Sequence, residues 1–292
     1  MKKIMPEIRQ EELTITMASE ITYAHVPYWY GTILRPLKMN ILMPKQREER
    51  KTRRPLFVFF CGGGVQVVDK DVWLPEMVYF AKRGFIIACP EYRTYNDAVF
   101  PAQMIDAKSA IRFLKAHADE FGIDKNRVAI GGESAGGNIS LCAGVYNDDP
   151  EYDMGDCLEE SSAVQCVINY YGGGGERRER WYATQKQIDD GKRVGVNTIE
   201  QSLGGRPDQI PEVYEKASVL YHVKPGLPKF MFLHGTEDKL SPIELVDPLY
   251  EKLQETGNYV EYYVFPGVEH GDDRLYQPET KDMVIDFLNR NM

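Results

Sequence analysis

The feature that most constrains this chain is a run of small residues around one serine, Gly132 to Gly137 (GESAGG). The apolar run Val128–Ile130 before it predicts a strand, and the small residues after the serine predict a helix. A strand that turns sharply into a helix holds its middle residue in a strained conformation and requires tiny neighbours. We therefore expect Ser134 to stand at the carboxyl end of a sheet, where open α/β proteins bind their ligands.

A glycine-rich turn that binds phosphate is the alternative interpretation of this motif. A dinucleotide site needs GxGxxG at the first strand–helix turn, and a P-loop needs GxxxxGK followed by Ser or Thr; the chain contains neither. The N-terminal N–H groups of the expected helix would face Ser134 and would stabilise negative charge that develops there. The sequence therefore favours a nucleophilic serine over a phosphate site.

Apolar runs alternate with helical patterns along most of the chain, which is typical of a mostly parallel sheet with helices on both faces. We expect a single α/β domain over residues 1–292 with about eight strands, of which the first two form an antiparallel entry. The expected strands are Leu13–Met17, Leu37–Met43, Leu56–Cys61, Phe85–Cys89, Arg127–Ile130, Val164–Tyr171, Lys229–His234 and Val260–Phe265. The expected helices include Trp73–Arg83, one that begins at Pro101, Ser134–Tyr146 and Thr280–Asn289.

A further helix start is predicted near residue 241. Ser241-Pro242-Ile243-Glu244 has the pattern of a capping box with proline at the first helical position. Pro248 would then lie inside this helix and kink it. Gly257 marks its expected end.

Residues 172–221 do not follow the alternation of strands and helices. They begin with the glycines Gly172–Gly175 and the charged run Glu176–Arg180, and they are polar with weak helical signals. Long loops are uncommon in compact domains and usually have a function. We therefore interpret this segment as an inserted cap over the site; a long ordered crossover with no substrate role is the alternative.

The histidine that would activate the serine is identified by its place in the chain. A serine hydroxyl needs a base to take its proton, and proteins with the nucleophile on such a turn carry the acid and then the histidine later in the sequence. His25 and His117 are thereby excluded, and His222 lies in a loop that leads into a strand. His270 follows the last expected strand in a loop between two glycines. We expect His270 to be the base; an exposed loop histidine is the alternative.

The acid is expected after the preceding strand, which ends at His234. Asp238 lies there, before the predicted helix start. A buried aspartate would accept the N–H of the catalytic histidine, fix its tautomer and stabilise the imidazolium. Glu237 is the rival, which we expect to point to solvent, and we expect His234 to brace the loop that carries the acid.

Acyl transfer also needs N–H donors for the developing oxyanion. The N–H of Ala135 is one by position, since Ala135 follows the nucleophile. The glycines after the third strand (Cys61-Gly62-Gly63-Gly64) let backbone N–H groups approach a substrate without side-chain collision. We expect Gly62 and Gly63 to supply the other donors; a flexible turn is the alternative.

Taken together, these motifs resemble the esterase and lipase families of the α/β-hydrolase fold, most of all hormone-sensitive-lipase-like esterases and acetylxylan and feruloyl esterases. The resemblance implies that fold and a Ser-Asp-His triad made of Ser134, Asp238 and His270. The resemblance covers roughly Leu56–Met292. Besides the motifs above, it rests on four short sequences: Phe100-Pro101-Ala102 with Asp106, Phe121-Gly122-Ile123-Asp124, His234-Gly235-Thr236-Glu237-Asp238 and Glu269-His270-Gly271.

One position departs from the pattern of these families. They usually have histidine before the glycines of the oxyanion loop, where it helps to hold the loop through hydrogen bonds, and this chain has Cys61. Cysteine is a weak donor and acceptor. The departure places the geometry of the loop and the turnover rate in question.

Composition excludes some classes of partner. The formal net charge of −9 argues against a nucleic-acid partner, because neutralising phosphates usually requires a basic face. The N-terminal residues are interrupted by charges, unlike a secretory signal, and no apolar stretch is long enough to span a membrane, so we expect a cytoplasmic protein. The five cysteines are scattered, which favours reduced thiols over a zinc site. No metal or organic cofactor is implied, and a homodimer is left open.

The function predicted on this basis is hydrolysis of small carboxylic esters with short acyl groups, from acetyl to butyryl. Acetylated sugars or oligosaccharides are candidate substrates, and Trp181 and Tyr182 in the expected cap fit either stacking on a sugar or ordinary packing. A non-catalytic binding protein on the same scaffold is one alternative. An amidase or peptidase is the other, since the triad itself does not distinguish it.

Overall fold

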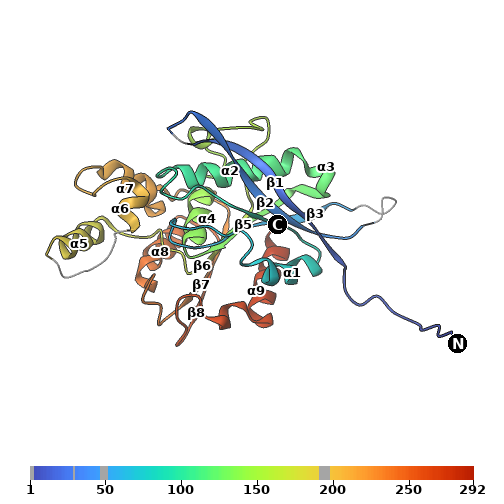
Figure 1. The fold of residues 1–292 in the computed structure, drawn as a ribbon. Helices are drawn as coiled ribbons and strands as arrows, with labels where there is room; N and C mark the ends of the chain where they lie inside the picture. Colours follow the sequence, from blue (N-terminus) through green and yellow to red (C-terminus); the bar gives the residue numbers. More distant parts are fainter. Residues whose placement is uncertain (1–2, 29, 47–51, 191–197) are drawn as a thin grey trace.

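The centre of the molecule is an eight-stranded sheet with the strand order β1-β2-β4-β3-β5-β6-β7-β8 (Figure 1). The computed structural model describes residues 3–28, 30–46, 52–190 and 198–292. Strand β2 runs antiparallel to β1 and β4, and the remaining neighbours are parallel. The strands are β1 (Ile15–Tyr28), β2 (Ile33–Pro44), β3 (Arg54–Phe60), β4 (Ile86–Pro90), β5 (Ile123–Glu133), β6 (Cys166–Tyr170), β7 (Lys229–Gly235) and β8 (Val260–Phe265). The mostly parallel sheet and its antiparallel entry are therefore as predicted.

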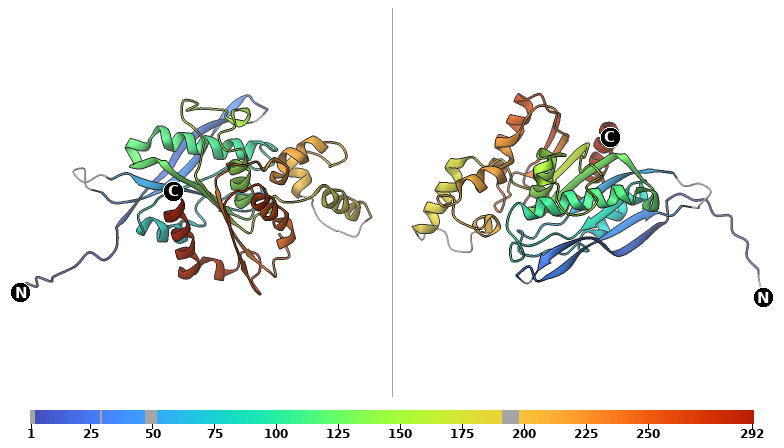
Figure 2. Two further views of the ribbon diagram at one scale, coloured as in Figure 1. Left: turned by 180° about the vertical axis from the view of Figure 1, so that it is seen from behind. Right: turned by 90° about the horizontal axis from the view of Figure 1, so that it is seen from above.

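Helices cover both faces of the sheet, which explains why its inner strands are apolar on both sides (Figure 2). In β3, Phe57 and Phe59 face one core with α1 (Leu74–Lys82) and α9 (Pro278–Asn291). The alternate residues, Leu56, Val58 and Phe60, face the other core. That second core is closed by α2 (Ala102–Ala116), α3 (Ala118–Phe121), α4 (Ala135–Val145) and α8 (Asp247–Glu255).

The predicted capping box at Ser241 is wrong. Only a short 3-10 turn, Ile243–Leu245, forms there, without a side-chain cap, and α8 begins at Asp247. The reason is Pro248, which has no N–H to donate and whose ring would clash with the carbonyl four residues earlier inside a helix. Proline is tolerated in a first turn, so Pro248 sets the start of α8 and does not kink it.

The predicted cap segment, residues 172–221, leaves the sheet after β6 and returns before β7. It contains α5 (Arg178–Asp189), α6 (Thr198–Leu203), α7 (Pro211–Ala217) and a 3-10 turn at Val219–His222; residues 191–197 of the prediction lie outside the described residues. The three helices lie to one side of the sheet, away from the N-terminal arm (Figures 1 and 2). Trp181 packs against Tyr214 and Tyr221 at ring-centroid distances of 5.4 and 5.8 Å, which gives the segment an apolar centre of its own.

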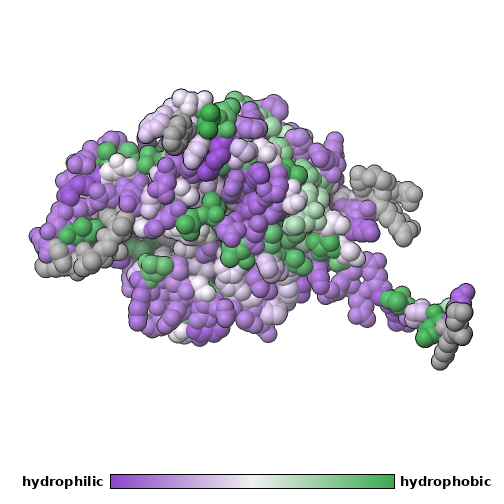
Figure 3. All heavy atoms as spheres, viewed as in Figure 1, coloured by the Kyte–Doolittle hydropathy of each residue, from purple (hydrophilic) through white to green (hydrophobic). Residues whose placement is uncertain are grey.

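Polar side chains cover most of the face of the molecule seen in Figure 3, and apolar residues there form small separate groups. Among the helices that the structure describes, none is both long enough and apolar enough to cross a membrane.

Helix α2 carries cations that are buried and that hold the segment after α4. The fully buried guanidinium of Arg112 lies 2.7 Å from Asp153 and donates to the backbone carbonyls of Met154 and Asp156. The ammonium of Lys108 donates to the carbonyls of Tyr146 and Asp149. These bonds replace water around the charges and fix the loop to the helix.

We expect Arg112→Ala to lower the free energy of unfolding by about 3 kcal/mol, because it removes the nearer of the two buried cations beside Asp153 and leaves the carbonyls of Met154 and Asp156 without their donor. The exposed pair of Lys125 and Glu160 provides the control, and Lys125→Ala should cost less than about 1 kcal/mol. Urea unfolding of both variants measures the difference. Equal losses for the two variants would contradict a special role for the buried cation.

Candidate active site

Ser134 occupies the turn between β5 and α4 in a conformation that side chains rarely adopt, with φ 54° and ψ −119°. The backbone N–H of Ser134 donates to the carbonyl of Tyr170 on the neighbouring strand at 2.9 Å. A Cβ atom at Gly132 would collide with the backbone of Gly136, and one at Gly136 would collide with the carbonyl of Phe60. The glycines are therefore required for the turn to close, and they leave the Ser134 hydroxyl at the carboxyl end of the sheet.

The structure brings the three predicted side chains together. His270, in the loop after β8, has its Nε2 atom 3.0 Å from Ser134 Oγ. The other ring nitrogen, Nδ1, lies 2.7 Å from Asp238 Oδ2. An imidazole that donates through Nδ1 to a carboxylate presents an unprotonated Nε2, which is the acceptor that a serine hydroxyl needs.

The carboxylate of Asp238 is completely buried and fully hydrogen-bonded. Its Oδ1 atom accepts the backbone N–H groups of Leu240 and Ser241 at 2.9 and 2.7 Å. Burial opposes ionisation, but the hydrogen bonds from His234, His270 and the Ser241 backbone outweigh it and hold the pKa of Asp238 well below its usual range. The rival acid, Glu237, is exposed.

His234 braces the loop of the acid. It is buried, and its Nε2 atom lies 2.7 Å from the carbonyl oxygen of Ser241 and 3.4 Å from Asp238 Oδ2. The remaining histidines have other neighbours: His117 pairs with Glu120, and His222 Nε2 lies 2.9 Å from the carbonyl of Glu215. Among the histidines that the structure describes, His270 is the one hydrogen-bonded to Ser134.

The prediction for Gly62 needs correction. The N–H of Gly62 donates to the carboxylate of Glu133, so this hydrogen atom is already engaged and is not free for an oxyanion. Gly63 adopts a positive φ of 111°, which favours glycine. Its N–H and that of Ala135, at the first position of α4, have no acceptor among the described residues. Gly63 and Ala135 therefore stay candidates, and Gly62 does not.

Sequence reasoning missed a cluster around Glu133. The indole N–H of Trp73 donates to Glu133 Oε1 at 3.1 Å, and the indole ring stacks on Tyr276 at 4.2 Å. The hydroxyls of Tyr276 and Tyr171 are hydrogen-bonded, and the ring of Tyr171 lies 4.6 Å from that of His270. These residues come from four separate segments, so no local spacing in the sequence could have connected them.

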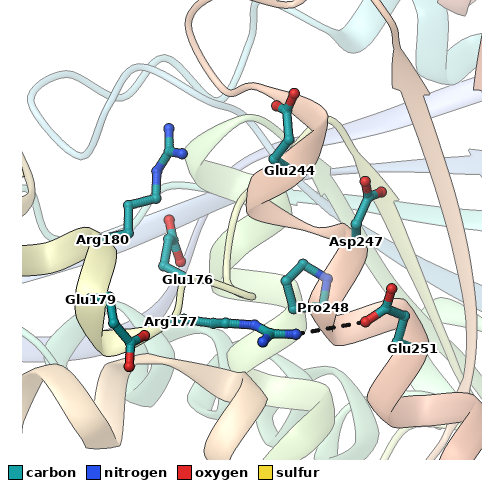
Figure 4. Close-up of a pocket in the computed structure, with 8 residues that line it drawn as sticks. All are labelled: Glu176, Arg177, Glu179, Arg180, Glu244, Asp247, Pro248 and Glu251. Atoms are coloured by element: carbon teal, nitrogen blue, oxygen red, sulfur yellow. Dashed lines mark ion pairs between the residues drawn. The ribbon is translucent and has the colours of Figure 1, made fainter. Parts of the chain in front are cut away.

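A pocket of about 390 Å³ lies between the first turn of α5 and α8 (Figure 4). None of the three triad residues lines it. Arg177 forms an ion pair with Glu251 at 3.7 Å across the pocket. Its remaining lining is Glu176, Glu179, Arg180, Glu244, Asp247 and Pro248. Such a charged wall suits polar groups better than a long acyl chain.

The described ranges contain no group of three or more His, Cys, Asp or Glu side chains arranged to hold a metal ion. The thiol of Cys61, next to the glycine loop, is buried, and burial raises its pKa to about 12. This thiol therefore stays neutral at physiological pH.

Comparison with known proteins identifies the family. The model of the BD-FAE family matches residues 39–253, which is most of the chain and includes Ser134 and Asp238. The chain belongs to the BD-FAE family. His270 lies beyond the matched range, so its assignment depends on the geometry described above.

The curated relatives of this BD-FAE member have esterase names. Esterase LipC of Mycobacterium tuberculosis is 29% identical over 237 residues, which cover 79% of this chain and 56% of LipC. Isoprenylcysteine alpha-carbonyl methylesterase ICME of Arabidopsis thaliana is 26% identical over 247 residues, covering 82% of this chain and 55% of ICME. The chain thus spans about half the length of the curated relatives it matches.

Solved structures give the fold. Esterase Est2 of Thermogutta terrifontis, bound to propionate, superposes with a TM-score of 0.73 at 27% identity and covers 94% of both chains. A truncated carbohydrate esterase from gut microbiota superposes with a TM-score of 0.77 at 20% identity, covering 97% of this chain and 98% of that one. The predicted α/β-hydrolase fold and the resemblance to esterase families are confirmed.

From the lowered pKa of Asp238 we predict how the free energy of unfolding depends on pH. An aspartate whose folded-state pKa is depressed contributes stability above its unfolded pKa of about 3.9 and loses it as the pH falls toward the folded value. Between pH 5 and pH 3 the free energy of unfolding should therefore fall more steeply for the native protein than for Asp238→Asn. Urea unfolding at several pH values measures this, with Glu237→Gln as the exposed control. Parallel curves for the native protein and Asp238→Asn would show that the carboxylate is not stabilised by folding.

Proposed function

We propose that this protein is a serine hydrolase that cleaves small carboxylic esters, with Ser134 as nucleophile, His270 as general base and Asp238 as the acid that orients it. The observation that carries the proposal is a pair of linked hydrogen bonds, in which Ser134 Oγ donates to His270 Nε2 (3.0 Å) and His270 Nδ1 donates to Asp238 Oδ2 (2.7 Å). The esterase names of the relatives support the same reaction class.

The geometry fits acyl transfer in two steps. His270 Nε2 takes the proton of Ser134 as Oγ attacks the ester carbonyl, and Asp238 stabilises the imidazolium that forms. The N–H groups of Gly63 and Ala135, with the N-terminus of α4, stabilise the oxyanion. His270 then gives its proton to the departing alcohol, which leaves an acyl-enzyme on Ser134. Water, activated by the same imidazole, releases the acid and restores the hydroxyl.

For the substrate, we propose short acyl groups from acetyl to butyryl. Est2 of Thermogutta terrifontis has been solved with propionate and with butyrate, at 27% and 26% identity. The charged pocket beside α5 would suit a hydroxylated alcohol portion, such as an acetylated sugar (Figure 4). Trp181 is buried against Tyr214, so stacking on a sugar would be left to the exposed Tyr182.

Labelling with a fluorophosphonate probe tests the reaction class. The native protein should be labelled and should hydrolyse nitrophenyl acetate. Ser134→Ala should lose the label, and the rate should fall roughly 10⁴- to 10⁶-fold in Ser134→Ala and in His270→Ala, because the triad acts as a unit. Ser161→Ala, at an exposed serine, is the control and should behave like the native protein. A native protein that takes no label would instead favour a binding protein on this scaffold.

A series of nitrophenyl esters from acetyl to dodecanoyl tests the acyl preference. We expect kcat/KM to be highest between acetyl and butyryl and to fall for longer chains, in line with the propionate and butyrate bound to Est2 of Thermogutta terrifontis. Acetylated xylo-oligosaccharide should release acetate. Equal kcat/KM on long chains would disprove the short-acyl preference, and faster cleavage of matched anilides than of esters would indicate an amidase.

A further inference from the structure

The glycine loop after β3, which carries the proposed oxyanion donor Gly63, is hydrogen-bonded to a carboxylate at the end of β5, the strand beside β3 in the sheet. Glu133 is the last residue of β5, and β5 pairs with β3 in the register Phe60↔Gly132. This register places the Glu133 side chain beside the loop that follows β3. Its Oε1 atom accepts the N–H of Gly62 and, at 3.1 Å, the indole N–H of Trp73.

A second group holds the same loop from the carbonyl side. The hydroxyl of the buried Tyr92 lies 3.1 Å from the carbonyl oxygen of Cys61 and 3.0 Å from that of Gly62. Peptide units are planar, so the Gly62 carbonyl and the Gly63 N–H belong to one rigid plane. Fixing Gly62 through its N–H and its carbonyl therefore fixes the direction of the Gly63 N–H, which is a proposed oxyanion donor.

The side chains in the loop itself cannot do this work. Cys61 is buried as a neutral thiol, which is a weak hydrogen-bonding group. A Cβ atom at Gly62 would overlap with the Glu133 carboxylate, so glycine is required where the carboxylate approaches the backbone. The absence of a side chain at Gly62 is therefore what allows the Glu133 carboxylate to reach the backbone of the loop.

The Glu133 side chain is in turn positioned by a cluster of aromatic residues. Trp73, which donates to it, stacks on Tyr276, and Tyr276 is hydrogen-bonded to Tyr171. Burial, with the charge of Glu133 next in size, raises the pKa of Tyr171 and keeps its hydroxyl protonated. Since the Tyr171 ring also contacts the ring of His270, one cluster borders both the oxyanion loop and the base.

We propose that Glu133 is a positioning residue for ester hydrolysis: its carboxylate orients the Gly62–Gly63 backbone so that the Gly63 N–H points at the oxyanion. This inference rests on the proposed function. Glu133 touches no reacting atom; it removes the freedom of a glycine-rich loop before the substrate arrives. Donors that are oriented in advance need no reorganisation as charge develops, which is why such donors are effective.

Two conservative variants separate the reach of the side chain from its charge. Glu133→Gln keeps the length and one acceptor oxygen, whereas Glu133→Asp keeps the charge but is one methylene too short to reach Gly62. We expect Glu133→Gln to keep kcat within about 3-fold, and Glu133→Asp to lose roughly 10- to 100-fold, less than removing an oxyanion donor outright. KM should change little in either. Glu279→Gln, at an exposed glutamate in α9, is the control.

A readout specific to the oxyanion completes the test. The inhibition constant of a trifluoromethyl ketone, whose adduct with serine carries an oxyanion, should rise in Glu133→Asp in proportion to the loss of kcat. Thermal melting confirms that both variants are folded. Native values of kcat and inhibition constant in Glu133→Asp would overturn the proposal, and so would a larger loss in Glu133→Gln than in Glu133→Asp, since charge and not reach would then matter.

The two proposals fail in different ways. If the hydrolase proposal is wrong, the native protein takes no fluorophosphonate label and shows no turnover. If only the role of Glu133 is wrong, the native protein is labelled and active, and Glu133→Asp matches it.

Discussion

The site depends on one close approach of backbone to backbone. Gly136, in the first turn of α4, lies so near the carbonyl of Phe60 that no side chain fits between them. At this contact the end of β3 lies against the start of α4, and Ser134 in the turn beside it has a positive φ. The nucleophile and the glycine loop are therefore adjacent because two strands are adjacent, and the strain at Ser134 is offset by the packing of the whole sheet.

Structural features that depend on residues close together in the sequence could be predicted from the sequence. The apolar runs predicted the strands, and the small residues around Ser134 predicted the turn, because sterics at a tight turn act between chain neighbours. His270 and Asp238 followed from chain order and from their loops after expected strands. The sequence failed at two positions, once because of a partner distant in the chain and once because a proline outweighed a capping pattern. Gly62 was expected to be a donor, but Glu133, one residue before the nucleophile, takes its N–H. At Ser241 the local pattern suggested a cap, and Pro248 determined the helix start.

The segment between β6 and β7 shows how a polar sequence can still fold. Its helical signals were weak, yet its described residues form α5, α6 and α7, and Trp181 of α5 packs against Tyr214 of α7 and against Tyr221. A few aromatic side chains supply enough buried area to order the segment, so its outer surface can stay charged. The pocket between this segment and α8 is accordingly lined mainly by carboxylate and guanidinium groups.

The distance in sequence between the side chains of the site has a consequence for biosynthesis. Ser134 and His270 are 136 residues apart, and His270 follows the last strand of the sheet. During synthesis on the ribosome, the loop between Ser134 and His270 cannot close until β8 and the residues that follow it have been made. Until His270 has been synthesised and β8 has joined the sheet, the Ser134 hydroxyl has no base, so we expect no ester hydrolysis by a nascent chain that ends before β8.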